Sequence, residues 1–457
     1  MASSAVSDPS RKQSRFRISI LGAFGVSLAA GFAVFAIDAT PRTLILIVAG
    51  AASLLTLLVY PEFALALYVV IGDVKGDERI ASLFPGDLTL AVGAILIAGI
   101  ALNSLRNKRV VQMPASYFLY LALAAWMGVS LTYTPVFAAG LEKLGRFLSV
   151  TGIVIIAPFF VLGTPAAMKR FFTGFAIFAF IICAYSLTDL GGSERLATPS
   201  NNTIGLGHIA CALVLLIWFA VIPKLPFLKR LVVYPVLAVP LLALIGSGSR
   251  GAVLALAAVL LVSLFFYRQL LLDAACLLAL GFVAIPLVNI PHASFEYLGT
   301  LFNSRNVDSL LNFRAELLSY GWNLLQQHPL MGVGIQGFRY HSLNAGLYNW
   351  PHNIFLETCC ELGIPAGLVV FAIFGAAIRE SFRQLWDTGA PFLTLSHVAA
   401  ALLLVGIVNA TNTGDINSDR STLLFLSLVF VVRGLRAQSP GPAKRSVHAA
   451  VGRPLLA

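Results

Sequence analysis

Apolar runs of membrane-spanning length recur along the chain, separated by short polar connections. A helix needs about 20 consecutive apolar residues to cross a bilayer, and only helices and closed barrels satisfy their backbone polar groups in lipid. The apolar segments are residues 18–36, 43–59, 62–71, 84–104, 115–132, 146–163, 170–188, 205–223, 230–246, 251–268, 270–289, 353–376, 391–409 and 421–436. The third is too short to cross alone, and residues 230–289 are crowded with short segments. We predict an all-α, polytopic integral membrane protein of about 12 (12–14) transmembrane helices.

One long polar segment interrupts this pattern within residues 301–371 and ends at Pro351-His352, where an apolar helix begins. Structureless loops of this length are uncommon and are often functional. Leucines recur at helical spacing over residues 308–327, which predicts an amphipathic helix lying against the membrane face. We expect this segment to carry the chemistry and the apolar helices to hold it in place.

Composition agrees with a membrane protein. Of the 457 residues, 58% are hydrophobic and 11% are charged, whereas soluble domains carry about 25% charged residues. The formal net charge is +11, but no basic stripe with interleaved aromatic residues is present, so we expect no nucleic-acid partner. The five cysteines lie in apolar runs without metal-ligand spacing, which favours core packing over disulfides or a metal site.

The distribution of basic residues predicts the orientation of the chain. Cytoplasmic loops of membrane proteins are enriched in Lys and Arg. With the N-terminus inside, 20 of the 31 basic residues are cytoplasmic, which leaves 31 − 20 = 11 for the opposite face. Both termini are then cytoplasmic, and the long polar segment lies on the outer face.

Arg314 and Arg250 are the first candidates for binding an anion. Arg314 shares the apolar face of the predicted helix with Leu310 and Leu317, so it either snorkels at the interface or aims its guanidinium into a cavity. Arg250 follows Gly246-Ser247-Gly248-Ser249 at the expected start of a helix. Backbone N–H groups, the helix dipole and a guanidinium together suit an anion there; the alternative is a tight turn whose arginine binds lipid headgroups.

His352 lies near the predicted start of a transmembrane helix, beside the aqueous face. The positive end of a helix lowers the pKa of an imidazole and favours the neutral form, which can act as a general base. The alternative is an interfacial histidine. Asn353, Glu357 and Glu361 recur every fourth residue along the same helix and either support the histidine or bind helices together.

Further polar residues on the expected outer face are candidates for substrate binding, although each is equally compatible with a plain surface position. They are Lys143 and Arg146 in an expected loop at 133–146, Arg195 in a loop at 189–205, and Asp415, together with His208 and Asp419. The chain has no Walker loop and no metal-ligand spacing, so we expect no metal and no cofactor.

These residues together resemble the bacterial O-antigen ligase and polymerase superfamily. The resemblance rests on Pro351-His352-Asn353, followed after nine residues by Gly363-Ile364-Pro365-Ala366-Gly367, on the run from Phe313 to Gly334 with His328-Pro329-Leu330-Met331-Gly332-Val333-Gly334, and on Ser249-Arg250-Gly251. The family pattern has Gly, Thr or Tyr where this chain has Ala366, with Gly367 following. The strongest part covers residues 250–370.

The resemblance implies a glycosyltransferase that moves an O-antigen glycan from undecaprenyl diphosphate to lipid A–core oligosaccharide at the periplasmic face of the bacterial inner membrane. It implies catalytic roles for His352, Arg314 and Arg250 and no metal, and it makes the two lipid-linked glycans and membrane lipids the partners. Binding roles for Arg146, Arg195, Lys143, Asn353 and Asp415 are our further expectation.

The corresponding parts of the chain are a cytoplasmic tail (1–17), an N-terminal transmembrane bundle (18–289), a long periplasmic segment with amphipathic helices (290–352), C-terminal transmembrane helices (353–436) and a disordered cytoplasmic tail (437–457). Alternatives within the superfamily are an O-antigen polymerase and a protein O-oligosaccharyltransferase. A transporter or flippase is more distant, because such proteins need charges spread through the bilayer depth.

Overall fold

The structure is a computed structural model, and it describes residues 41–78, 86–106, 111–192, 194–266, 271–276, 279, 288–299, 308–346, 350–386, 393–412 and 415–438. The predicted span at 18–36, most of that at 270–289, and the predicted tails at 1–17 and beyond residue 438 lie outside these ranges. Every element assigned in the described residues is a helix, which confirms the all-α fold class.

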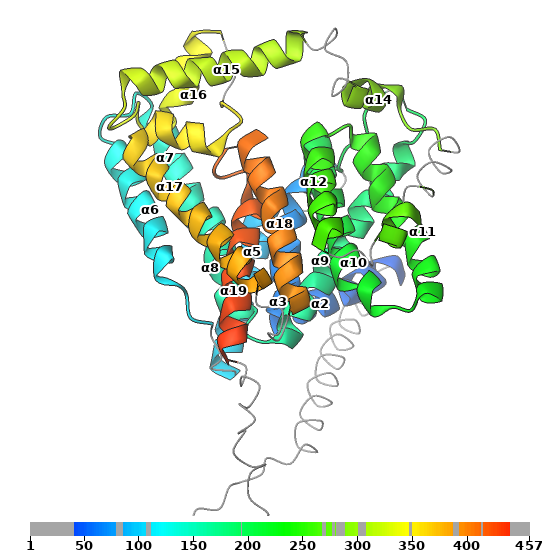
Figure 1. The fold of residues 1–457 in the computed structure, drawn as a ribbon. Coiled ribbons are helices and arrows are strands. Elements are labelled where there is room, and N and C mark those ends of the chain that lie inside the picture. The colour runs from blue at the N-terminus through cyan, green and yellow to red at the C-terminus, as the bar shows by residue number, and fades with distance from the viewer. Residues whose placement is uncertain are drawn as a thin grey trace, which may run out of the picture.

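The helices follow one another in a bundle (Figure 1). The longer ones are α2 (Pro41–Val59), α3 (Pro61–Val70), α5 (Leu88–Arg106), α6 (Phe118–Ser130), α7 (Phe137–Arg146), α8 (Gly152–Val161), α9 (Pro165–Ser186), α10 (Thr203–Ala220), α11 (Phe227–Ser247), α12 (Arg250–Phe266), α14 (His292–Gly299), α15 (Asp308–Gln327), α16 (Gly337–Asn344), α17 (Ile354–Trp386), α18 (Leu393–Asn412) and α19 (Arg420–Gln438). Short helical turns are η1 (Ile71–Asp73), η2 (Ala115–Tyr117), η3 (Phe147–Thr151), η4 (Leu187–Asp189) and η5 (Ile222–Lys224).

The described residues hold eight helices that are long and apolar enough to cross a membrane. A ninth is reached if α2 and α3, which are bent by 109° at Tyr60, count as one broken span. The predicted count of about 12 is therefore not confirmed. α3 is only 10 residues long, in agreement with the expectation that this segment does not cross alone.

α10 forms the centre of the bundle. Its residues from Leu206 to Phe219 are almost all buried, because it packs against α9, α11, α12 and α18. A helix that is apolar on all sides is stable only when its neighbours cover every face. The N-terminus of α10 thus provides a fixed point for the loops at that end of the molecule.

The prediction of a loop at 133–146 is wrong, because α7 occupies Phe137–Arg146 and continues through η3 into α8. Its polar residues concealed the helix in the sequence. α7 is amphipathic, and it buries Gly140 and Lys143 while Glu142 and Arg146 stay exposed. η3 is a turn of π-helix, a local widening that is frequent at functional sites.

The predicted amphipathic helix is α15, and its bounds Asp308–Gln327 are those expected. α15 lies across one end of the bundle, above the start of α17 (Figure 1). It buries Leu317, Leu324 and Leu325 against Phe338 of α16 and Cys360 of α17. Most of its contact with the bundle is therefore made through α17.

α17 is broken at Gly363, whose φ of +83° and ψ of 169° are not helical. A side chain at this position would overlap the carbonyl of Leu330, so only glycine fits. The break opens the helix, and the run from 329 to 334 pairs with it: Val333 N donates to Cys360 O at 2.8 Å, and Ile364 N donates to Pro329 O at 2.8 Å. The two sequence motifs around His328-Pro329 and Gly363 are thus one structural unit.

Candidate functional site

His352 lies two residues before α17, in the connection from α16, and its backbone has a φ of +53°. Left-handed backbone is rare for residues other than glycine, and it concentrates at functional sites. Asn353 caps the helix: its Oδ1 accepts from Leu356 N at 3.0 Å, and its Nδ2 donates to Thr411 O at 3.3 Å. His352 is therefore held against both α17 and the end of α18.

Arg314 lies within electrostatic reach of both His352 and Arg250. Partial burial and the positive charge of Arg314 both lower the pKa of His352 below its ordinary value of 6.5. Burial and the charge of Arg250 likewise lower the pKa of Arg314. The charge of Arg250 thus acts on Arg314, and the charge of Arg314 acts on His352, although α12, α15 and the 350–353 connection are far apart in the sequence. Arg314 is half-buried, which fits both a snorkelling arginine and a guanidinium directed inward, so its binding role stays a prediction.

Arg250 is the first residue of α12, where the sequence placed it. The preceding turn is tight, with Gly248 at a φ of +62° as the C-cap of α11. Arg195 lies against this turn: its Nε donates to Ser247 O at 2.7 Å, and its guanidinium stacks on Tyr297 at 4.3 Å. Burial and, less strongly, the charge of Arg250 lower the pKa of Arg195. The turn therefore gathers two arginines.

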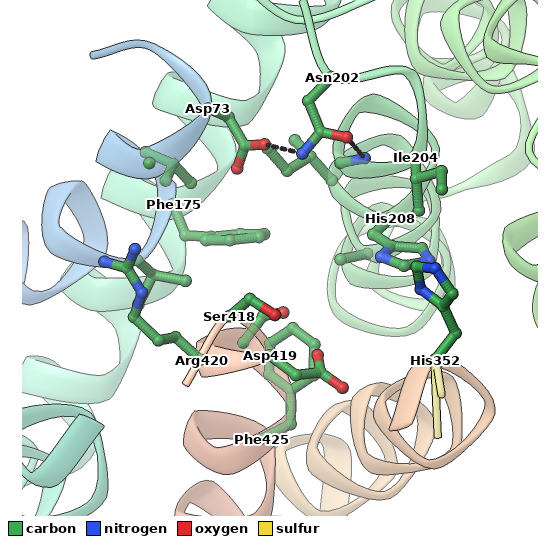
Figure 2. A pocket seen from close by; sticks show the side chains of 17 residues that line it. Asp73, Phe175, Asn202, Ile204, His208, His352, Ser418, Asp419, Arg420 and Phe425 are labelled. Carbon is green, nitrogen blue, oxygen red and sulfur yellow. Dashed lines mark hydrogen bonds between the residues drawn. The ribbon is translucent and has the colours of Figure 1, made fainter. Parts of the chain in front are cut away.

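A cavity of about 390 Å³ adjoins His352 (Figure 2). Its polar lining comes from the end of η1 (Asp73), the N-cap and first turns of α10 (Asn202 and His208), and the start of α19 with the residue before it (Arg420 and Asp419). Its apolar lining includes Phe175 and Phe425. Figure 2 shows His352 and His208 at one end of the cavity and Arg420 at the other.

α10 separates this cavity from the Arg250 turn. Its Gly207 packs so closely on Ser247 and Ser249 that an added Cβ would overlap the Ser249 side chain. The next residue, His208, lines the cavity. The site therefore has two sides. The cavity side is the cavity that His352 lines, and the arginine side consists of Arg250 and Arg314, of which Arg314 acts electrostatically on His352.

Lys143 is buried inside the protein, with about 3% of its side chain exposed. Its Nζ donates to Glu357 Oε1 at 2.5 Å and to Glu361 Oε2 at 2.7 Å, which joins α7 to the first part of α17. The other oxygen of Glu357 accepts from Ile416 N at 3.1 Å. These contacts support the reading of Glu357 and Glu361 as residues that bind helices together, and they give Lys143 protein carboxylates as partners.

The connection before α19 is held by the same group of residues. Asn417 Nδ2 donates to Lys143 O at 2.9 Å, and Thr151 Oγ1 donates to Asn417 Oδ1 at 2.9 Å. Asp415 shapes the turn, because its Oδ1 accepts from Ser418 N at 2.7 Å. This network sets where the connection presents Asp419 to the cavity.

The remaining predicted binding residues differ in position. Arg146 lies outside the cavity lining, on an exposed face of α7, and forms a 2.6 Å ion pair with Glu142. Asp415 lies next to the cavity residue Ser418 without lining the cavity itself. Binding roles for Arg146, Arg195, Lys143, Asn353 and Asp415 stay predictions.

Sequence reasoning missed Asp73, Asn202 and Arg420 as members of the site. Asp73 Oδ1 accepts from Asn202 Nδ2 at 3.3 Å, and Arg420 lies against Gly72, the residue before Asp73. The available signal was modest: an arginine at the start of the last span, closely following two aspartates. Nothing in the sequence joins it to residues some 350 positions earlier.

Residues 235–372 match the family described as O-antigen ligase. The matched region contains Arg250, Arg314 and His352, together with the helix break at Gly363. The match confirms the resemblance to the O-antigen ligase and polymerase superfamily over this part of the chain, and it supports glycan transfer of that general type. A search of curated proteins found no match to the chain.

Proposed function

We propose that this protein is an O-antigen ligase, which transfers a glycan from undecaprenyl diphosphate to lipid A–core oligosaccharide. The observation that carries the proposal is that Arg314 lies electrostatically close to both His352 and Arg250, and that all three residues belong to the matched region. In the proposed setting, this end of the molecule faces the periplasm and the membrane is the bacterial inner membrane.

The arginines suit the leaving group. Breaking the bond between the sugar and undecaprenyl diphosphate builds negative charge on the diphosphate, and donors already aimed at that charge lower the barrier. Arg250 and Arg314 carry planar guanidinium groups that bond phosphate oxygens in pairs. An anion bound close to both groups would interact favourably with both positive charges.

His352 suits the role of general base. The leaving diphosphate needs no proton, so the remaining chemical task is to take the proton from the attacking acceptor hydroxyl. Burial and Arg314 lower the pKa of His352, which keeps its imidazole neutral and able to accept that proton at neutral pH. In the proposed step, the acceptor oxygen attacks the anomeric carbon directly and inverts it, the C–O bond to the diphosphate breaks, and His352 keeps the proton.

An O-antigen polymerase would use the same residues with another lipid-linked glycan as acceptor, and a protein O-oligosaccharyltransferase would use a protein. We favour the ligase because the chain has a single long polar segment before His352.

The test is transfer by purified protein from undecaprenyl-diphosphate glycan, with lipid A–core as acceptor or with no acceptor. Glycan on the core is the result expected of a ligase. Lengthened glycan on undecaprenyl diphosphate would make the protein a polymerase instead. Absence of any transfer from this donor, by a protein that is folded in detergent or nanodiscs, would overturn the proposal.

A further inference from the structure

The cavity beside His352 contains polar atoms without protein partners. Asp419 is about 7% exposed, and its Oδ2 accepts no hydrogen bond from the described residues. Nε2 of His208 and Nη1 of Arg420 likewise have no partner among them. All three residues line the same cavity. Unsatisfied buried polar atoms cost about 1–3 kcal/mol each, so a group that bonds to them is expected in the cavity.

The arrangement of these atoms limits the chemistry of that group. Asp419 Oδ2 requires a donor, whereas Nη1 of Arg420 requires an acceptor. Hydroxyl groups supply both, and a saccharide carries several of them on one rigid ring. Phe175 and Phe425 offer apolar surface to the C–H faces of such a ring. The cavity volume of about 390 Å³ lies within the usual ~300–1,000 Å³ of small-molecule sites.

A phosphate group fits the cavity poorly. Arg420 is the only Lys or Arg among the lining residues, and the carboxylates of Asp73 and Asp419 line the cavity with it. Burial raises the pKa of Asp419 to about 7 and that of Asp73 to about 6, so at neutral pH Asp73 is mostly ionised and offsets the charge of Arg420 even where Asp419 is neutral. The cavity therefore has no net positive charge, in contrast with the Arg250 turn.

The position of the cavity assigns it to one of the two substrates of the proposed reaction. In the proposed reaction, the base must lie close to the hydroxyl group of the acceptor and also to the donor sugar that this hydroxyl attacks. His352 meets this requirement, because it lines the cavity and lies electrostatically close to Arg314 on the arginine side. We infer that the cavity is the subsite for the acceptor saccharide, which Asp419, Arg420 and His208 hold with its reactive hydroxyl toward His352. The inference rests on the proposed function, in which the diphosphate of the donor occupies the arginine side.

Binding measurements test this assignment without relying on turnover. The probes are delipidated core oligosaccharide, free O-antigen repeat oligosaccharide and undecaprenyl diphosphate, each titrated into purified protein by calorimetry or thermophoresis. The variants are Asp419→Asn and Arg420→Gln on the cavity side and Arg250→Gln on the arginine side. Asp189→Asn, in the exposed turn η4, is the matched carboxylate control.

Asp419→Asn keeps an oxygen that can accept from Thr422 Oγ1 and replaces Oδ2, a negatively charged acceptor, with a neutral NH2 donor. We expect Asp419→Asn and Arg420→Gln to weaken oligosaccharide binding about 10- to 100-fold, the loss typical of a hydrogen bond to a charged group. Their affinity for undecaprenyl diphosphate should stay within twofold of wild type. Arg250→Gln should show the opposite pattern, and Asp189→Asn neither effect. A variant whose unfolding temperature drops by several degrees is replaced by His208→Gln.

The two oligosaccharide probes identify the source of the saccharide. Binding of the core oligosaccharide places the lipid A–core acceptor in the cavity, whereas binding of the repeat oligosaccharide alone places a second lipid-linked glycan there; either supports a saccharide subsite. The inference is overturned if wild type binds neither probe, or if the cavity variants weaken undecaprenyl diphosphate instead. Failure of the proposed function looks different: cavity-dependent oligosaccharide binding would persist while transfer from undecaprenyl-diphosphate glycan is absent.

Discussion

At the scale of single residues, the site combines strain with electrostatic repulsion. His352 adopts a left-handed backbone, and Arg314 and Arg250 are close enough for each charge to affect its neighbour. Left-handed backbone and neighbouring like charges both carry a free-energy cost, and the proposed function predicts that an anionic ligand reduces the electrostatic part of it. The consequences are measurable in pH profiles and in conservative substitutions.

Replacing His352 with Ala should lower the rate of glycan transfer by about 10²–10⁴, the usual contribution of a general base. The measurement is initial rate at saturating donor and acceptor, with the unfolding temperature checked against wild type. A folded variant with wild-type activity would remove His352 from the chemistry.

The pH profile separates a base from a merely structural histidine. Because burial and Arg314 lower the pKa of His352, its neutral form persists below pH 6.5. The acidic limb of kcat/KM for wild type should therefore lie below pH 6.5. Arg314→Gln removes the positive charge and should move that limb upward while lowering the rate. A limb that stays in place would show that His352 is not the titrating group.

The guanidinium groups should not be replaceable by ammonium groups. We expect Arg314→Ala to lower kcat about 10²–10³-fold, the loss typical of one preorganised donor. Arg314→Lys keeps the charge but loses the paired N–H geometry, so it should recover only part of the rate. Full recovery with Lys would indicate a general electrostatic role.

At the scale of elements, the broken helix α17 explains the spacing that characterises the family resemblance. The residues between His352 and Gly363 form the first part of α17. This part ends at the break at Gly363, where residues 329–334 form backbone hydrogen bonds with α17. The carbonyl of Leu362, at the break, accepts a hydrogen bond from the side chain of Trp126 (Nε1, 2.8 Å). The motif thus places a histidine at one end of a short helix and fixes the other end in the protein.

Gly363→Ala should therefore destabilise the protein by at least about 2–3 kcal/mol, because alanine resists a φ of +83° and its Cβ would overlap Leu330. Gly375→Ala, later in the same helix, has open space around it and should be neutral or stabilising by about 0.5–1 kcal/mol. Thermal unfolding in detergent compares the two variants. Equal unfolding temperatures would contradict this role of the break.

The buried Lys143 group makes a second prediction at this scale. Lys143→Met leaves two buried carboxylates without their partner, which we expect to cost about 3–5 kcal/mol. Adding Glu357→Gln and Glu361→Gln should restore much of the lost unfolding temperature. Arg146→Met, on the exposed face of the same helix, removes a surface ion pair and should change stability by less than about 1 kcal/mol. A substrate-binding lysine would instead affect KM without affecting unfolding.

At the scale of the whole molecule, the candidate site residues lie at one end of a helical bundle. α15, the start of α17, the start of α19 and the Arg250 turn all meet there (Figure 1). α10 begins at this end, after its N-cap Asn202, and leads to η5 (Ile222–Lys224) at the opposite end. Positive-inside counting predicts that the opposite end is cytoplasmic.

Cysteine labelling tests that orientation. In a background where the five native cysteines are replaced, Leu343→Cys on the exposed surface of α16 should react with a membrane-impermeant maleimide in spheroplasts. Lys224→Cys should react only after lysis. The reverse pattern would invert the proposed topology and place the site in the cytoplasm.

The sequence by itself determined the features that depend on neighbours within a few turns of helix. Apolar runs located the eight helices of the described residues that are long enough to cross a membrane, leucine periodicity gave the bounds of α15, and a glycine-serine turn located the start of α12 at Arg250. Such patterns are readable because the residues that define them are three or four positions apart. The same reasoning missed α7, whose exposed polar face resembles a loop.

Only the tertiary structure decided which distant residues meet. Lys143 meets Glu357 more than 200 positions later, and Arg420 joins Asp73 at the cavity across almost the whole described chain. Helix packing fixes these encounters through the shapes of complementary surfaces, and no local pattern records them. That is why the arginine side of the site could be read from the sequence, whereas its cavity side became visible only once the helices were assembled.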